Sequence, residues 1–500
     1  MGRGRRDTLR NLGYPRSLYP LLVEDRGFGE PNVILLPCGA GRVKKKREAW
    51  AVFPAPHSGD SAIAAMGENT MQPIILHIDM NSYFASVEQQ ANPFLRGKSV
   101  GVCATMGPHG CIVASSREAK AKGIKTGCRV LDALCVDPKI VLLPYDSDKY
   151  RTCTKKIFSI FARYTDRIEP YSIDEAFLDL TGFVPTLQKA AELGARIQTI
   201  IKNEVGEWLA CSVGVAETRW LAKFAGDTAP KGSVLVLECS MLPAYYKQFR
   251  LTDAWGINVR MERRLNALGI FTLNDLRCAD PARLMPSLGK LGYYLWADVN
   301  GIELGGLAEE GQPKSIGHSH VMTNRQERNL PLRVLMKLCE KTGRRLRNLG
   351  LEAHGLSVWW SYVDGGGFHT SRCVPAALFD TRDIFRPAAA LLKEPELNHE
   401  ILSLSVSVFD LYLRSRQLSF LEDIEGRDRL IRSLDHINDR YGEYTVFRGT
   451  MWATEKHAPD RVGFRKTLNI REQLREDRQV ASFGDVVYTP STSTEVFHTM

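Results

Sequence analysis

YSIDEAFLDLTG, residues 171–182, places Asp174 and Glu175 side by side in a run that is otherwise apolar enough for a buried strand. A second segment, PIILHID (residues 73–79), predicts a strand that is buried on both faces and ends in an acid, Asp79. Taken by themselves, Asp174 and Glu175 are more typical of a turn beside a strand. Their meaning depends on whether the two strands share one sheet.

Three carboxylates at strand ends of one sheet would form a site of hard oxygen ligands, which Mg²⁺ prefers together with waters and phosphates. Two such ions about 3.5 to 4 Å apart clamp an in-line phosphoryl displacement, because one activates the attacking hydroxyl and the other neutralises the leaving diphosphate. The charge of the metals would offset the repulsion between adjacent acids. The pattern therefore favours phosphoryl transfer with two Mg²⁺ ions.

The composition favours a cytoplasmic protein with no membrane partner. Five hundred residues with 44% hydrophobic and 25% charged content are enough for two to four globular domains. The sequence has no apolar run as long as a membrane span, and its basic N-terminus lacks the pattern of a secretory signal. The eleven cysteines are odd in number and no two are spaced as C-x-x-C, which indicates reduced core thiols.

The net charge of +9 is concentrated at the start of the chain. Residues 1–50 hold eleven Lys or Arg and five Asp or Glu, so their surplus of six leaves only +3 for the remaining 450 residues. Residues 1–70 show no sustained period of two or 3.6, which predicts a disordered leader or spurious upstream sequence; a basic arm for nucleic acid is the alternative. Nucleic-acid binding would therefore depend on local basic faces.

Strand and helix patterns alternate from residue 71 onward. Helical spacing in residues 82–92, 149–166 and 186–206, with strands between them, predicts an α+β palm-like sheet. Short helices follow from residue 251. The patterns within residues 313–413 run strand, helix, strand, strand, helix, strand, which predicts a further compact unit.

Two long motifs resemble the catalytic motifs of Y-family DNA polymerases in the bacterial polymerase IV (ImpB/MucB/SamB-type) branch. They are HIDMNSYFASVEQ (residues 77–89) and RIEPYSIDEAFLDLTG (residues 167–182). The stretches SREAKAKGIKTG, VGVAETRWLAKFAGD, AWGINVRMERRLNALGI and KSIGHSHVM follow in the family's order, so the resemblance spans residues 71–452. It implies an α+β right-hand fold with a palm, small fingers, a helical thumb and a little finger made of a four-stranded sheet and two helices.

The resemblance also divides the chain into domains. It implies a palm at residues 71–93 and 145–240, fingers at 94–144, a thumb with a helix-hairpin-helix at 241–312 and a little finger at 313–413. Residues 1–70 are the leader, and residues 414–500 are a C-terminal tail with a clamp-binding-like motif. Within that tail, residues 429–449 resemble a helix and strand of bacterial members.

The resemblance implies a catalytic and metal site. Its ligands for two Mg²⁺ ions would be the carboxylates of Asp79, Asp174 and Glu175, with the backbone carbonyl of Met80. Phe84, five residues after Asp79, corresponds to the family's steric gate. A ring packed against the sugar at this place leaves no room for a 2′-hydroxyl group.

In the family, a Tyr and an Arg on the fingers helix and a Lys on the palm contact the triphosphate, and this sequence differs at these positions. Arg117 stands in place of the Tyr, and Lys120 stands in place of the Arg. Lys120 keeps the positive charge but lacks the bidentate guanidinium group of Arg. The palm Lys corresponds to Lys231 in DTAPKG, a segment one residue shorter than usual. Tyr83 is expected to pack in the fingers, and a plain aromatic core is the alternative for Tyr83 and for Phe84.

DNA contacts are expected outside the palm. Residues 255–269 resemble a helix-hairpin-helix, in which Gly256 lets backbone N–H groups approach a phosphate; a plain turn is the alternative. A predicted helix at residues 332–350 carries many cations and one acid, which predicts phosphate binding, with a solvated face as the alternative. Its expected DNA contacts are Arg333, Lys337, Lys341, Arg344 and Arg345. The little-finger sheet is expected to turn its polar face towards the DNA backbone.

QLSFLED, residues 417–423, resembles the pentapeptide by which bacterial polymerases dock on the sliding clamp. The contacts would be Gln417, Leu418, Phe420 and Leu421. Phe420 precedes Leu421, which reverses the usual order, so a chance amphipathic stretch is the alternative.

Together the motifs imply a template-directed DNA polymerase of low fidelity that adds deoxynucleotides opposite damaged template, with a role in damage tolerance and repair. Its partners would be primer–template DNA, deoxynucleoside triphosphates and the sliding clamp, and it would act as a monomer. One alternative is a non-catalytic adaptor on the same fold, but such relatives typically lose the acids, and all three are present here. Another palm-based enzyme, such as a nucleotide cyclase, would leave the thumb and little-finger segments without a purpose.

Overall fold

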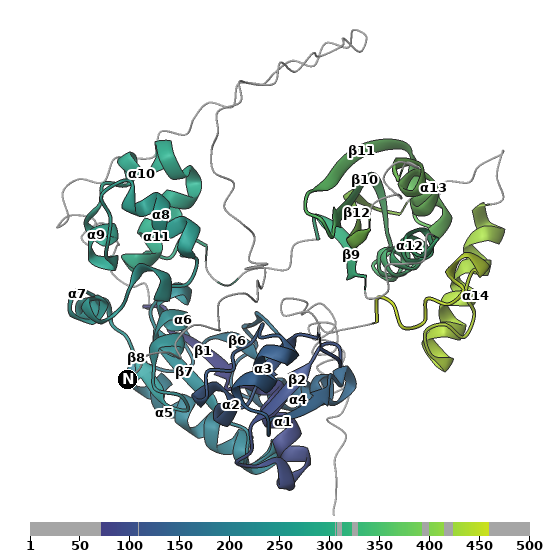
Figure 1. Ribbon diagram of the computed structural model, residues 1–500. Helices are drawn as coiled ribbons and strands as arrows, with labels where there is room; N and C mark the ends of the chain where they lie inside the picture. The colour runs from purple at the N-terminus through teal and green to yellow at the C-terminus, as the bar shows by residue number, and fades with distance from the viewer. Residues whose placement is uncertain are drawn as a thin grey trace, which may run out of the picture. The chain divides into compact units, whose positions relative to one another are not determined.

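The computed structural model describes residues 72–459, apart from residues 109, 306, 308–312, 323–328, 393–399 and 415–423. Figure 1 draws their helices and strands in colours that run from purple to yellow along the chain. The expected leader and the clamp-binding-like motif lie outside the described residues. No helix in the described part of the chain combines the length and the apolar character needed to cross a membrane.

A five-stranded sheet forms the palm, in the order β5-β6-β1-β7-β8. β1 (Ile75–Met80) lies in its middle and pairs antiparallel with β6 (Glu175–Asp179) and with β7 (Cys211–Ala216). β5 (Ile168–Pro170) and β8 (Val234–Val236) form the edges. The two acid-bearing segments are therefore neighbouring strands of one sheet.

Helices cover both faces of the palm sheet. They are α1 (Tyr83–Ala91), α4 (Ser147–Phe161), α5 (Leu187–Ile200), a π-helical turn at Ile201–Val205, and α6 (Arg219–Thr228). α1, α4 and α5 share a core with Leu76 and Ile78 of β1, whereas α6 shares a second core with Ile75 and Phe177. Since side chains alternate along a strand, β1 is buried on both faces, as its apolar sequence predicts.

The fingers are a three-stranded sheet in the order β3-β2-β4 with a small core of their own. Their elements are a 3₁₀ turn at Pro93–Leu95, β2 (Val100–Cys103), β3 (Ile112–Ser115), α2 (Arg117–Ala121), α3 (Val130–Val136) and β4 (Val141–Pro144). The side chain of Ser116 accepts a hydrogen bond from the backbone N–H of Ala119 and so caps α2. This cap starts α2 directly after β3.

Short helices form the thumb, as predicted from residue 251 onward. They are α7 (Leu242–Tyr245), α8 (Val259–Asn266), α9 (Leu273–Cys278), α10 (Pro281–Leu288) and α11 (Lys290–Val299), with 3₁₀ turns at Cys239–Met241, Tyr246–Gln248 and Leu251–Asp253. The side chains of Asn258, Thr272 and Asp280 cap α8, α9 and α10. Apolar thumb residues share a core with α6 of the palm.

The little finger has the element order that the sequence predicts. It consists of β9 (Ser315–Val321), α12 (Leu330–Asn348), β10 (Leu351–Tyr362), β11 (Gly367–Leu378), α13 (Thr381–Leu391) and β12 (Ile401–Leu413). The strands form an antiparallel sheet in the order β11-β10-β12-β9, and its core includes Val334, Leu338 and Trp360. α14 (Ile424–Tyr441) and a 3₁₀ turn at Gly449–Met451 follow, and the described residues of this segment contain no strand.

Candidate active site

Backbone pairing brings the three acids together. Asp79 on β1 lies opposite Glu175 on β6 in the antiparallel register. The backbone N–H of Met80 donates a hydrogen bond to the carbonyl oxygen of Asp174 at 2.9 Å. Because main-chain groups make both contacts, the sheet itself sets the positions of the acids. The residues predicted at strand ends therefore lie at the same end of one sheet.

The turn after β1 places an aromatic side chain close to the acids. Ser82 adopts a left-handed backbone conformation, with φ of 51° and ψ of 42°, so α1 begins three residues after Met80. The Oγ atom of Ser86 donates to the carbonyl oxygen of Asn81 at 2.8 Å and holds this tight connection. Phe84, in the first turn of α1, thus lines the same cavity as Asp79.

Two partners hold Glu175, and neither was identified from the sequence. Lys223 Nζ donates to Glu175 Oε2 at 2.7 Å, and His77 Nε2 lies 3.1 Å from the same oxygen. Burial lowers the pKa of His77, which favours a neutral ring that donates from Nε2. Although burial raises the pKa of Glu175, its hydrogen bond with His77 and the charge of Lys223 lower it to about 2. Glu175 is therefore ionised at neutral pH.

Asp79 and Asp174 concentrate negative charge beside Glu175. Burial raises the pKa of Asp79 to about 8, and the charges of Asp174 and Glu175 add to this effect. Burial also raises the pKa of Asp174, against the opposing effect of a hydrogen bond from Ser172. Ionised acids in such a group are unfavourable unless a cation lies between them.

Asp79 and Asp174 line two cavities, and Glu175 lines one of them. The larger, of about 610 Å³, is lined by Asp79 and Asp174 together with Phe84, and by three cations described below. The smaller, of about 350 Å³, is lined by Asp79, Tyr171, Ser172, Asp174, Glu175, Lys223 and Trp255. Because Asp79 and Asp174 line both, two reactants in the two cavities would meet at these carboxylates.

The donor atoms at this site fit a hard divalent cation. They are the carboxylate oxygens of the three acids, and Met80 lines the larger cavity beside them. In the part of the chain that the structure describes, no three His, Cys, Asp or Glu side chains are gathered closely enough to hold a metal ion as they stand. The carboxylates of Glu175 and Asp174 are instead turned to Lys223 and Ser172. These contacts use Glu175 Oε2 and Asp174 Oδ1, the latter accepting from Ser172, and one oxygen of each carboxylate stays outside them.

Phe84 and Tyr83 are the aromatic residues that line the larger cavity. The ring of Phe84 stacks on Tyr150, with 4.4 Å between the ring centroids and 21° between the planes, and meets Tyr145 edge-on at 5.3 Å. Tyr83 lies beside it, and its hydroxyl donates to the carbonyl oxygen of Tyr150 at 2.9 Å. The hydroxyl of Tyr83 therefore binds the palm helix α4, while Tyr83 also shares a core with Val102 and Ala114 of the fingers strands.

The three cations expected to meet a triphosphate line the larger cavity. Arg117 and Lys120 lie on α2, and Lys231 follows α6. Burial lowers the pKa of Lys120, and the positive charge of Lys231 lowers it further, so the two ammonium groups are close enough to interact. The guanidinium of Arg117 lies over the ring of Trp208, 5.4 Å from its centroid. Positive charge thus faces the acids across this cavity.

Comparison with known proteins identifies the family. The impB/mucB/samB family model matches residues 78–227, and the model of the family's C-terminal domain matches residues 313–420. DNA polymerase IV 1 of Bacillus subtilis (strain 168) is 30% identical to this chain over 404 residues, which cover 79% of this chain and 96% of that protein. The chain belongs to the impB/mucB/samB family.

Further comparisons agree with this family and its fold. DNA polymerase IV of Pelotomaculum thermopropionicum (strain DSM 13744 / JCM 10971 / SI) is 30% identical over 383 residues, which cover 75% of this chain and 94% of that protein. Among solved structures, a Y-family DNA polymerase chimera matches with a TM-score of 0.61 at 23% identity, over 68% of this chain and 100% of that chain. The family and the right-hand fold predicted from the motifs are confirmed.

The thumb of this impB/mucB/samB family member carries Gly256 in the turn before α8. Its φ of 92° is accessible to Gly and unfavourable for other residues. The ring of Trp255, directly before it, meets Tyr171 edge-on at 5.6 Å, and the carbonyl oxygen of Trp255 accepts a hydrogen bond from Trp220 Nε1 at 3.1 Å. The turn is therefore tied to the palm beside the smaller cavity, which Trp255 and Tyr171 both line.

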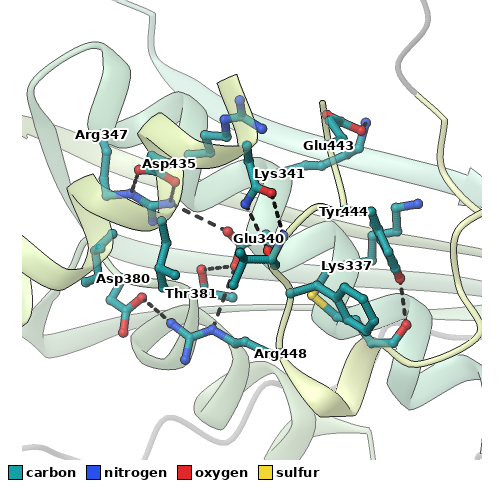
Figure 2. A pocket seen from close by; sticks show the side chains of 17 residues that line it. Lys337, Glu340, Lys341, Arg347, Asp380, Thr381, Asp435, Glu443, Tyr444 and Arg448 are labelled. Carbon is teal, nitrogen blue, oxygen red and sulfur yellow. Dashed lines mark hydrogen bonds and ion pairs between the residues drawn. The ribbon is translucent and has the colours of Figure 1, made fainter. Parts of the chain in front are cut away.

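The C-terminal segment, residues 424–459, covers cations of α12. Lys337 is only 3% exposed, and its Nζ donates to the carbonyl oxygens of Thr454 at 2.8 Å and Glu455 at 3.0 Å. Lys341 Nζ pairs with Glu443 at 3.2 Å. Figure 2 shows these side chains among the residues that line a pocket between α12 and the C-terminal segment.

The remaining expected DNA contacts on α12 also have partners within the chain. Arg344 pairs with Asp439 of α14. The guanidinium groups of Arg333 and Arg345 donate to backbone carbonyl oxygens at 3.0 and 3.2 Å. Each of these cations therefore has a partner within the chain, and their contact with DNA stays a prediction.

Ion pairs fasten α14 and the residues after it to the little finger. Arg347, with only 6% of its side chain exposed, makes hydrogen bonds of 2.7 and 2.8 Å to the carboxylate of Asp435. Arg448 pairs with Asp380 at 2.9 Å and lies 3.8 Å from Glu340 (Figure 2). The little-finger structure therefore continues past residue 413, and residues 424–459 are part of it.

Sequence reasoning missed several residues that surround the acids. His77 and Lys223 fall inside the quoted motifs HIDMNSYFASVEQ and VGVAETRWLAKFAGD, so a basic residue in each motif was the available signal. Ser172 and Trp255 also line the smaller cavity, and no pattern in their own segments indicates this. Of the expected site residues, the clamp contacts Gln417, Leu418, Phe420 and Leu421 lie outside the described residues.

Proposed function

We propose that this chain is a template-directed DNA polymerase that adds deoxynucleotides to a primer 3′ end opposite damaged template. The observation that carries the proposal is that Asp79 and Asp174 line two cavities at once. The larger cavity is lined by cations that suit a triphosphate, and the smaller one suits a primer end. The DNA polymerase IV relatives support the same reaction. A non-catalytic adaptor is not favoured.

The larger cavity would receive the incoming nucleotide. Arg117, Lys120 and Lys231 would neutralise its triphosphate, with Lys120 acting as a point charge because it lacks the guanidinium fork. Phe84 would face the sugar and exclude a 2′-hydroxyl group. These roles follow from residues that line one cavity together.

Two Mg²⁺ ions would be held by the three acids and the backbone carbonyl of Met80. When bound, they supply activation of the attacking hydroxyl and neutralisation of the leaving diphosphate. The chain keeps Glu175 ionised through its contacts with His77 and Lys223. Lys223 also balances part of the charge of the acids until a cation binds.

DNA would be held by contacts that do not depend on sequence. The turn at Gly256 offers backbone N–H groups to a phosphate. On the face of the little-finger sheet away from α12 and α13, hydroxyl groups stand in a row, because Ser357 lies opposite Ser371 on β11 and Ser407 on β12. Hydroxyl side chains are common partners of phosphate and sugar oxygens.

The remaining proposals come from the sequence. Gln417, Leu418, Phe420 and Leu421 would bind a sliding clamp, and the polymerase would act as a cytoplasmic monomer of low fidelity. Its role would be in damage tolerance and repair.

Primer extension tests the proposal. The full chain is incubated with a primer annealed to an undamaged or an abasic template, four deoxynucleoside triphosphates, and either Mg²⁺ or a chelator. We expect elongation of both primers with Mg²⁺ and none with the chelator. An absence of primer-dependent incorporation, or the formation of a cyclic nucleotide from triphosphate alone, would refute the proposed reaction.

A further inference from the structure

The ring proposed to exclude ribonucleotides depends on a second ring behind it. Tyr150 stacks on Phe84 at 4.4 Å with 21° between the planes, and it also meets Tyr145 at 5.1 Å. Tyr150 is fully buried, with 0% of its surface exposed. Because buried side chains are closely packed, a shift of the Tyr150 ring would let the Phe84 ring shift as well.

Glu88 holds Tyr150 in this place. It lies four residues after Phe84 on α1, so the two side chains share one face of the helix. Its carboxylate accepts a hydrogen bond from Tyr150 Oη at 2.8 Å, and Lys149 Nζ donates to its two oxygens at 3.0 and 2.9 Å. Glu88 is only 7% exposed, so these donors from consecutive residues of α4 compensate the burial of its charge.

A second set of hydrogen bonds ties α4 to the acid-bearing strand. Tyr83 Oη donates to the carbonyl oxygen of Tyr150 at 2.9 Å and lies 2.7 Å from Thr154 Oγ1. Thr154 Oγ1 donates to the carbonyl oxygen of Ile173 at 2.8 Å, one residue before Asp174. The support behind Phe84 is thus fixed relative to the acids, and Glu88 fixes its outer end.

We infer that Glu88 is a positioning residue for sugar selection, which acts by holding Tyr150 behind Phe84. The inference rests on the proposed function, with Phe84 as the gate. Steric exclusion requires that the ring of Phe84 is held rigidly, because a ring that is free to shift makes room for the 2′-hydroxyl group of a ribonucleotide. A deoxynucleotide lacks the 2′-hydroxyl group and therefore does not push against the ring. Loss of the support should therefore affect ribonucleotides selectively.

The test is the ratio of kcat/KM for a deoxynucleotide to kcat/KM for the matching ribonucleotide. It is measured by single-nucleotide incorporation with the full chain, Mg²⁺ and primer–template DNA. Glu88→Leu removes both hydrogen-bonding oxygens, whereas Tyr150→Phe removes only the hydroxyl group and keeps the ring. In each variant we expect this ratio to fall roughly tenfold, the scale of one lost hydrogen bond to a charged group, with kcat/KM for the deoxynucleotide within about twofold of the parent.

Three further variants complete the design. Glu88→Gln keeps a side-chain oxygen that accepts from Tyr150, so it should restore most of the discrimination that Glu88→Leu loses. Glu204→Gln is the matched control, because Glu204 makes two hydrogen bonds with Arg163 at 2.8 and 2.6 Å but is 45% exposed and does not line either cavity. It should leave the ratio unchanged. Phe84→Ala gives the ratio without a gate.

The outcomes separate the assignments. A parallel fall of kcat/KM for both sugars in Glu88→Leu and Tyr150→Phe would show that Glu88 only supports the fold, and it would overturn the inference. An unchanged ratio in both, with discrimination lost in Phe84→Ala, would overturn it as well. If Glu88→Leu does not fold, Tyr150→Phe decides. A Phe84→Ala variant that discriminates like the parent would refute the gate and this inference together, whereas a parent without incorporation would refute the proposed function.

Discussion

The backbone N–H of Met80 donates a hydrogen bond to the carbonyl oxygen of Asp174 at 2.9 Å, so the two acid-bearing motifs are joined by the main chain at the site itself. Asp79 lies opposite Glu175 in the same pairing of β1 with β6. Side-chain substitutions do not remove these backbone contacts. Each carboxylate can therefore be replaced without moving the others, which makes the role of each one measurable.

The acids are expected to be required for catalysis and dispensable for DNA binding. Asp79→Ala, Asp174→Ala and Glu175→Ala should each slow single-nucleotide incorporation by roughly 10²-fold to 10³-fold or more, the scale of losing a group that stabilises developing charge. Duplex affinity should stay close to that of the parent, because the proposed phosphate contacts lie in other domains. Fluorescence anisotropy with labelled primer–template DNA checks this. Affinity that falls in step with activity would contradict the assignment.

Asp79 is expected to lower the stability of the fold when no metal is bound. Burial and the neighbouring acids raise the pKa of Asp79 to about 8, so at neutral pH folding without metal must add a proton to this carboxylate, and this proton uptake opposes folding. Asp79→Asn removes the need for this proton uptake and should raise the melting temperature in chelator by roughly 1 °C for each 1 kcal/mol gained, the scale expected for a chain of 500 residues. Differential scanning calorimetry measures the shift. A variant that melts below the parent would show that an ionisable group at this position does not oppose folding.

Much of the palm was predictable because its signals are local. The apolar run that ends at Asp79 and the apolar run that surrounds Asp174 and Glu175 each indicate a strand within a few residues. The pairing of those strands is not local, and the family resemblance supplied it. The network of Glu88 and Tyr150 was not predicted, because an acid and a tyrosine sixty-two residues apart give no shared pattern in the sequence.

The cations of α12 show that the charge of one segment does not reveal its binding partners. The observed helix, Leu330–Asn348, begins and ends two residues earlier than the expected range of residues 332–350, because Pro331 suits a first turn and Gly350, with φ of 64°, follows the end of the helix. Its cations were assigned to DNA, whereas Asp435, Asp439 and Glu443 of the C-terminal segment pair with cations of this helix. Nothing within the helix distinguishes a cation that meets a phosphate from one that meets a carboxylate.

The C-terminal segment is expected to stabilise the little finger through Asp435. Asp435→Ala leaves the guanidinium of Arg347, 6% exposed, without its bidentate partner, so the free energy of unfolding should fall by about 3 kcal/mol. Glu192→Ala is the control, because its pair with Lys189 is more than half exposed on both sides and should contribute at most about 1 kcal/mol. Urea unfolding compares the two. Equal effects would show that Arg347 does not depend on Asp435.

The clamp-binding-like motif is predicted to increase processivity without affecting chemistry. Replacing Gln417, Phe420 and Leu421 with Ala should leave extension of a short template unchanged and remove the stimulation by clamp and loader on a long template. The reversed order of Phe420 and Leu421 predicts weaker binding than a standard peptide, and isothermal titration with the clamp would measure it. Equal stimulation of variant and parent would identify the stretch as a linker.

Anomalous diffraction from Mn²⁺ tests most directly the central claim that the acids form the catalytic centre between two cavities. Crystals would contain the chain, primer–template DNA, Mn²⁺ and a deoxynucleotide analogue that cannot be cleaved. We predict two Mn²⁺ peaks bound by Asp79, Asp174 and Glu175, with the triphosphate against Lys120 and Lys231 and the primer end in the smaller cavity. A nucleotide bound elsewhere, or Mn²⁺ without contact to these carboxylates, would contradict the account.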